Sequence, residues 1–132
     1  MWNIKESAQC TFCPCVDNLE HFFFYCSISH AFWLQLINWL NRSLKVNRDI
    51  SVLEALFGII NVDKDQFYWL NFIILIAKYF ISKCKQNVRE LSLESFMKVL
   101  KSKISMEKII YHKRDREHLF NERFLYLYNV LY

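Results

Sequence analysis

The stretch from Cys10 to Cys26 reads CTFCPCVDNLEHFFFYC and holds four of the five cysteines in a chain of 132 residues. Within it, Cys10, Cys13, His21 and Cys26 follow the pattern C-x2-C-x7-H-x4-C. Three thiolates and one imidazole form the ligand set of a closed tetrahedral zinc site. Because four protein ligands leave no open position for water or substrate, we predict one structural, non-catalytic Zn²⁺ held by these four residues.

Two other interpretations of these cysteines stay open, namely buried thiols that act as small hydrophobic side chains and a disulfide. The N-terminus MWNIKES lacks the apolar segment and the small-residue cleavage site of a signal peptide. We therefore expect a reducing compartment, the cytoplasm or the nucleus, rather than secretion, and metal-bound thiolates rather than disulfides. Cys15 lies too close to Cys13 to be an independent ligand, and we expect Cys84 to be structural.

The composition favours a mainly α fold with a dense core. Hydrophobic residues make up 54% of the chain and aromatic residues 17%, with one glycine and one proline. Sandwiches and barrels need many tight turns, which so few glycines and prolines do not supply. We predict a small zinc knuckle in residues 1–30, joined in one structural domain to a helical body and tail in residues 31–132, with a bundle of about four to five helices.

Local patterns place these helices. Apolar residues recur at helical spacing between His30 and Leu44, with Ser27 or Ser29 as the candidate cap. Ser51 and Glu54 form a capping box before a short helix that should end at Gly58. A long apolar helix is predicted for residues 65–86, and the 15-residue apolar run inside it, 67–81, is shorter than the ~20 residues of a membrane span. We therefore expect a buried core helix and no membrane partner.

The last third of the chain contains a second long helix and a tail. Ser92 should begin this helix, whose buried stripe is predicted to be Leu93, Phe96, Leu100, Ile104 and Ile109. Periodicity is weak in the tail. We expect a break near residues 113–115 and fraying toward the end of the chain.

Charge is distributed unevenly along the chain. Up to Ala77 there are 5 basic and 7 acidic side chains, a net charge of −2, whereas from Lys78 onward there are 12 basic and 6 acidic side chains, a net charge of +6. A positive field of this kind favours a polyanionic partner such as RNA or DNA. The candidate nucleic-acid contacts are Lys83, Lys85, Arg89, Lys98, Lys101, Lys103, Lys108, Lys113, Arg114 and Arg116, together with Phe12 as a ring that could stack on an unpaired base.

Catalytic motifs are absent from the sequence. It contains no glycine-rich phosphate loop and no G-x-S-x-G nucleophile elbow. We therefore expect no enzymatic activity and no small-molecule substrate. The sequence does not indicate an oligomeric state.

The quoted residues resemble a known family. Cys10-x-Phe12-Cys13, then LEHFF at residues 19–23, Cys26 and Phe32-Trp33, is similar to the C-terminal zinc-binding segment of reverse transcriptases from non-LTR (LINE-type) retrotransposons. The resemblance continues in LFG at residues 56–58, IILIAKYFISKCK at residues 73–85 and MEK at residues 106–108. It covers about residues 2–113 and is most specific in the first third, whereas residues 119–132 fit the family poorly.

This resemblance implies a nucleic-acid-binding accessory module that helps to hold the element's RNA, with Cys10, Cys13, His21 and Cys26 as the zinc ligands. The chain departs from the family in lacking a polymerase with paired aspartates for magnesium, so we expect a non-catalytic fragment. The spacer of seven residues before His21 also differs from the four of retroviral knuckles. The alternative function is a helical protein-interaction or scaffold module whose zinc is purely structural.

Overall fold

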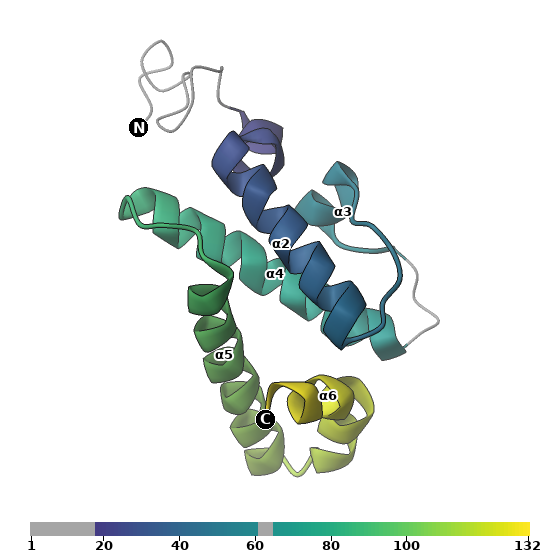
Figure 1. Cartoon of the computed structure of the whole chain (residues 1–132). Helices are drawn as coiled ribbons and strands as arrows, with labels where there is room; N and C mark the ends of the chain where they lie inside the picture. The colour runs from purple at the N-terminus through teal and green to yellow at the C-terminus, as the bar shows by residue number, and fades with distance from the viewer. Residues whose placement is uncertain (1–17, 61–64) are drawn as a thin grey trace.

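The described part of the chain is built from helices alone. The computed structural model describes residues 18–60 and 65–132, and every regular element in these ranges is helical. They are the π-helix η1 (His21–Tyr25), α2 (Ser27–Ser43), α3 (Val52–Phe57), α4 (Asp65–Gln86), α5 (Leu93–Lys113) and α6 (Glu117–Leu131) (Figure 1). The predicted mainly α class is confirmed, while the predicted knuckle residues before Asn18 lie outside the described ranges.

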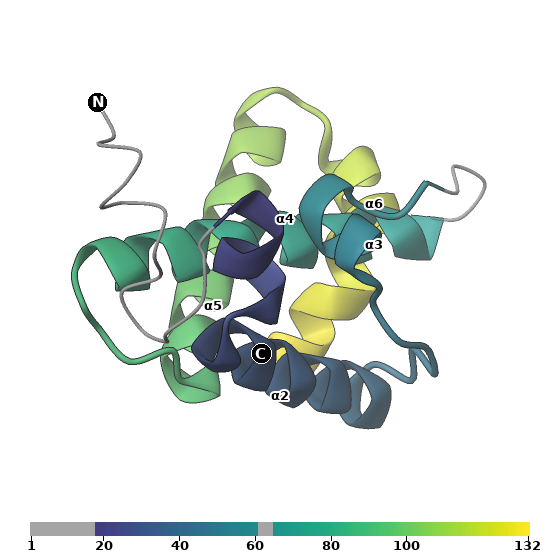
Figure 2. The same cartoon turned by 90° about the horizontal axis from the view of Figure 1, so that it is seen from above.

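Helix α4 is the central element, as its apolar sequence predicted. It contacts η1, α3, α5 and α6, and α2 runs across it (Figures 1 and 2). A helix that is apolar on most faces needs neighbours on most sides, and these elements supply them. Leu75, Tyr79 and Lys83, spaced four residues apart, are exposed and mark a face that remains in contact with solvent. The buried residues of α4 are Trp69, Leu70, Ile73, Ile74, Ile76, Ala77, Phe80, Ile81, Cys84 and Lys85.

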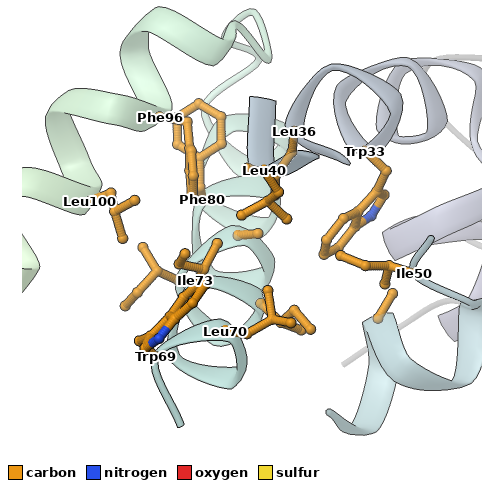
Figure 3. Packing of buried hydrophobic residues seen from close by; sticks show 14 of the residues in the cluster. Trp33, Leu36, Leu40, Ile50, Trp69, Leu70, Ile73, Phe80, Phe96 and Leu100 are labelled. Carbon is orange, nitrogen blue, oxygen red and sulfur yellow. The ribbon is translucent and has the colours of Figure 1, made fainter. Parts of the chain in front are cut away.

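Three phenylalanines join α2, α4 and α5 at the centre of the core. The ring centroids of Phe32 and Phe80 are 5.3 Å apart, those of Phe32 and Phe96 are 5.3 Å apart, and those of Phe80 and Phe96 are 5.5 Å apart. These separations lie in the range in which tilted and edge-to-face aromatic pairs attract. Figure 3 shows Phe80 and Phe96 side by side, with Leu36 of α2 and Leu100 of α5 around them.

The ends of α3 and α5 follow the predicted signals. The Ser51 Oγ accepts a hydrogen bond from the Glu54 N–H and the Glu54 carboxylate accepts one from the Ser51 N–H, which confirms the capping box. Gly58 ends α3 with φ 88°, and a β-carbon there would lie 3.1 Å from Asn71 Oδ1. Ser92 caps α5 by accepting from the Ser95 N–H at 3.1 Å.

Three expectations about the helices are wrong. Neither Ser27 nor Ser29 caps α2, because Cys26 occupies the N-cap position and no side chain caps that end. Ile109 is 55% exposed and does not belong to the buried stripe of α5. The tail does not fray in the described structure, since Phe120 and Phe124 are buried against α4 and α5 and hold α6 in the bundle.

The predicted break near residues 113–115 is confirmed. Asp115 has φ 54°, the Arg116 N–H donates to the Tyr111 carbonyl at 2.8 Å and the Asp115 N–H donates to the His112 carbonyl at 3.1 Å. This pair of bonds is a Schellman motif, which ends a helix by turning the chain back on itself. Across residues 18–60 and 65–132, no helix combines the length and the apolar character needed to cross a membrane.

Candidate metal site and nucleic-acid interface

A wide helical turn brings His21 and Cys26 together. The Cys26 N–H donates to the His21 carbonyl at 2.7 Å, so the four intervening residues form one π-type turn closed by an i to i+5 bond. Asn18 fixes its start, because the Asn18 side chain accepts from the His21 N–H at 2.8 Å. His21 is 8% exposed and Cys26 is fully buried. The H-x4-C spacing of the sequence therefore corresponds to a single turn with both residues directed into the protein.

Side chains of the body satisfy the carbonyls of this turn. The Phe22 carbonyl accepts from the Ser29 hydroxyl and from the Lys85 ammonium, both at 2.7 Å. The Phe23 carbonyl accepts from the Trp33 indole N–H at 2.5 Å. A π-turn offers carbonyls that an α-helix would use internally, and unpaired buried carbonyls are costly. The turn is thus held by donors from α2 and α4.

Cys26 also lies at the start of a helix. It is the N-cap residue of α2, a helix of 17 residues, and its carbonyl accepts from the His30 N–H at 2.7 Å. The N-terminus of a helix carries partial positive charge from its backbone N–H groups. A thiolate at this position is favoured electrostatically, which suits a metal ligand.

The described residues contain half of the predicted ligand set. His21 and Cys26 are described, whereas Cys10 and Cys13, and the stacking candidate Phe12, lie outside the described residues. In residues 18–60 and 65–132, no three His, Cys, Asp or Glu side chains come together as a metal-binding group. Cys84 is buried on α4, 58 residues after Cys26 in the sequence. Burial raises the pKa of its thiol, while Arg89 opposes the shift.

The predicted basic candidates, on α4, on α5 and in the segments that follow these helices, are mostly exposed. Two ion pairs occur among the described residues, Arg48–Glu54 and His112–Glu117, and neither uses a candidate residue. The charge of the exposed candidates is therefore not neutralised by a contacting carboxylate within that part of the chain. These candidates are Lys83, Arg89, Lys98, Lys101, Lys108, Lys113, Arg114 and Arg116, with Lys103 half-buried.

The ammonium groups of Lys83 and Lys103 both lie over the ring of Tyr79. The Lys103 Nζ lies 4.9 Å from the centre of the Tyr79 ring, and the Lys83 Nζ lies 5.8 Å from it. Lys83 and Tyr79 belong to α4 and Lys103 belongs to α5, so the packing of the two helices creates the cluster. Tyr79 is 45% exposed. We call Lys83, Tyr79 and Lys103 the Tyr79 cluster.

A second group of lysines and aromatic rings lies on another side of α5. The Lys108 Nζ is 4.3 Å from the Tyr128 ring centre and the Lys101 Nζ is 5.6 Å from the Tyr132 ring centre. Residues two positions apart on an α-helix point about 200° apart, which directs Lys101 and Lys103 to different sides. The basic residues of α5 thus form two aromatic-lined groups rather than one continuous face.

Lys85 has a different role from the one we predicted. It is 8% exposed, its ammonium donates to the Phe22 carbonyl, and its Nζ lies 4.4 Å from the centre of the Phe22 ring. These contacts join α4 to η1. We therefore leave Lys85 out of the proposed nucleic-acid surface, although its sequence environment resembles that of Lys83.

Tyr79 and Arg123 were not among the residues predicted from the sequence. Tyr79 and Lys83 are four residues apart on an exposed face of α4, a spacing that places two side chains together on a helix. That signal could have identified the pair. Arg123 had no such signal, because its partners Tyr68 and Tyr111 come from other helices.

Comparison of the chain with protein-family models, with curated protein sequences and with solved structures gives no match. The resemblance to the retrotransposon segment therefore stays a prediction that rests on the residues quoted for it.

Proposed function

We propose that the chain is a zinc-stabilised, non-catalytic module that binds single-stranded nucleic acid, as its resemblance to the C-terminal segment of a retrotransposon reverse transcriptase implies. The observation that carries the proposal is the Tyr79 cluster, in which lysines from two helices flank one exposed aromatic ring. A ring can stack on an unpaired base while ammonium groups contact the flanking phosphates. Such recognition needs positively charged side chains that extend to the phosphates, and it depends little on the base sequence.

The residues of the η1 turn fit a zinc site. His21 and Cys26 are buried and joined by a backbone hydrogen bond, and Cys26 is the N-cap residue of a long helix. Zn²⁺ would tie this turn to Cys10 and Cys13 and so fix the first part of the chain on the helical body. In this proposal the metal stabilises the fold, and the basic and aromatic side chains supply the affinity for nucleic acid.

A titration with fluorescent single-stranded RNA at several salt concentrations tests the proposal. The double variant Lys83→Gln/Lys103→Gln should lose two phosphate contacts, which lowers the slope of log affinity against log salt by about 1.4. Tyr79→Leu should weaken binding by about tenfold through lost stacking, with the salt slope unchanged. The matched control is Arg42→Gln/Lys45→Asn, which removes the same charge at two exposed positions, one in the last turn of α2 and one just after it.

The control separates a site from a general attraction. If Arg42→Gln/Lys45→Asn weakens RNA binding as much as Lys83→Gln/Lys103→Gln does, binding reflects net charge alone and the Tyr79 cluster is not the site. Absence of RNA binding by the wild-type chain at about 150 mM salt would contradict the proposed function altogether.

One observation favours the alternative, a protein-interaction module. Three large apolar side chains are exposed on and just after α3, with Leu53 at 64%, Phe57 at 71% and Ile60 at 89%. Exposed apolar side chains that gather on one surface are typical of protein contacts. This candidate predicts that the zinc-loaded chain folds but binds no RNA in the titration above.

A further inference from the structure

A groove between α5 and α6 gathers three arginines. It has a volume of about 790 Å³, and its lining includes Arg114, Arg116, Arg123, Tyr111 and Glu107. Sites for small ligands commonly have volumes of several hundred Å³. The single carboxylate of Glu107 leaves a surplus of two positive charges in the lining.

The turn between the helices places two of these arginines. Arg114 is the C-cap residue of α5, and Arg116 follows Asp115, whose φ of 54° reverses the chain. The Arg116 N–H is bound to the Tyr111 carbonyl at 2.8 Å, so the backbone on both sides of the reversal is fixed. Both side chains are exposed and lie within reach of a ligand in the groove.

Contacts with two tyrosines fix the third arginine. One terminal nitrogen of Arg123, Nη1, donates to the Tyr111 hydroxyl at 3.0 Å and to the Tyr68 hydroxyl at 3.3 Å. The guanidinium carbon lies 4.4 Å from the Tyr68 ring centre. The hydrogen bond to Tyr111 is the main reason why the pKa of Arg123 is raised above its ordinary value. A guanidinium held in this way is oriented in advance for an anion.

We propose that this groove is a binding site for a phosphate group, in which the forked guanidinium groups of Arg114, Arg116 and Arg123 contact the phosphate oxygens. Arginine suits this chemistry because its planar fork can donate two parallel hydrogen bonds to one phosphate. Neither Arg123 nor the groove belongs to the Tyr79 cluster, so the inference does not depend on the proposed function. The phosphate could come from the end of a nucleic acid or from a free polyphosphate.

Calorimetric titration of the full chain with pyrophosphate, without RNA, tests the site. The wild-type chain should bind pyrophosphate saturably, and Arg114→Gln/Arg116→Gln should weaken binding by about tenfold or more through lost charge-assisted hydrogen bonds. Arg123→Lys keeps the charge but loses the fork, and it should also weaken binding. Thermal unfolding of each variant verifies that it is folded.

The control variant Arg42→Gln/Lys45→Asn removes two charges from exposed positions outside the groove. It should leave pyrophosphate binding nearly unchanged. Equal weakening by the two double variants, or no saturable binding by the wild-type chain, would overturn the proposal.

A second titration identifies the source of the phosphate. If an oligonucleotide with a terminal phosphate binds more tightly than the same oligonucleotide with a terminal hydroxyl, and Arg114→Gln/Arg116→Gln abolishes the difference, the source is a nucleic-acid end. If both oligonucleotides bind equally while pyrophosphate still requires the arginines, the source is a free polyphosphate. A chain that binds pyrophosphate but no RNA would retain this site and lose the proposed function.

Discussion

The backbone N–H of Cys26 donates a 2.7 Å hydrogen bond to the carbonyl oxygen of His21 and so closes the π-turn η1. This bond places two residues that are separated by four others at the two ends of one helical turn. It also makes the turn dependent on the body of the protein, because the widened turn relies on Ser29, Lys85 and Trp33 as donors to its carbonyls.

Trp33 should contribute to stability through its indole N–H as well as through burial. Its side chain is fully buried and donates to the Phe23 carbonyl. We expect Trp33→Phe to lower the free energy of unfolding by about 3 kcal/mol, through lost volume and a lost hydrogen bond. Urea unfolding followed by circular dichroism measures the change. The half-buried Trp39 supplies the control, and equal losses for Trp33→Phe and Trp39→Phe would contradict a specific role for the Phe23 bond.

Ser29 and Lys85 should act together, because both donate to the Phe22 carbonyl. Ser29→Ala and Lys85→Met are each expected to lower the free energy of unfolding by about 1–2 kcal/mol. The double variant should lose more than the sum, since the carbonyl then has no side-chain donor. A double-mutant cycle in urea measures this coupling. A coupling energy of zero would mean that the two donors do not share the Phe22 carbonyl in solution.

Val88 lies in a strained position at the end of α4. Its φ is 51°, the Arg89 N–H donates to the Cys84 carbonyl at 2.7 Å and the Val88 N–H donates to the Lys85 carbonyl at 3.3 Å, which makes a second Schellman motif. A β-branched residue is unfavourable there, so Val88→Gly should raise the free energy of unfolding by about 1 kcal/mol. Thermal unfolding measures the gain.

A glycine introduced in the middle of a helix should instead lower the free energy of unfolding. Ser102 is exposed in the middle of α5, and Ser102→Gly is expected to lower stability by about 0.5–1 kcal/mol. A loss of stability in Val88→Gly would show that the valine is not strained in solution.

Tyr68 should make stability depend on pH in the alkaline range. The hydrogen bond with Tyr111 raises the pKa of Tyr68 above its ordinary value of 10.0, and partial burial raises this pKa further. The folded chain therefore keeps this proton at a pH where the unfolded chain loses it. The resulting stability is complete below pH 10.0 and is lost as the pH rises through the folded pKa.

Urea midpoints measured across this range test the prediction. Tyr68→Phe should flatten the fall in stability above pH 10.0, and Tyr25→Phe, at an exposed position on η1, should leave it unchanged. The same slope in wild type and Tyr68→Phe would show that another group causes the fall.

The helices were predictable wherever a local signal determined them. Ser51, Gly58 and Ser92 mark helix ends through bonds to residues a few positions away, and the structure confirms all three. The turn at His21 was not predictable as a π-turn, because its carbonyl partners come from α2 and from Lys85 on α4. Burial of Lys85 has the same cause, since sequence alone does not separate it from the exposed Lys83.

The structure of the tail, residues 117–131, also depends on contacts with helices distant in sequence. Weak periodicity after Arg123 suggested fraying, yet Phe124 and Leu127 are buried because α4 and α5 offer an apolar surface to α6. The groove at Arg123 also depends on this long-range packing. For the candidate metal site, the spacing of His21 and Cys26 identified the pair, while their pairing with Cys10 and Cys13 stays a prediction.

The zinc content of the purified chain is the most direct test of the central claim, that His21 and Cys26 form half of a structural zinc site. Elemental analysis should find about one zinc per wild-type chain, and about one in Cys84→Ser, because Cys84 is not a ligand. Cys26→Ser should lose most of the metal while keeping most of the circular-dichroism signal of the helices. Less than about 0.2 zinc per wild-type chain, with the cysteines freely reactive toward thiol reagents, would contradict the claim.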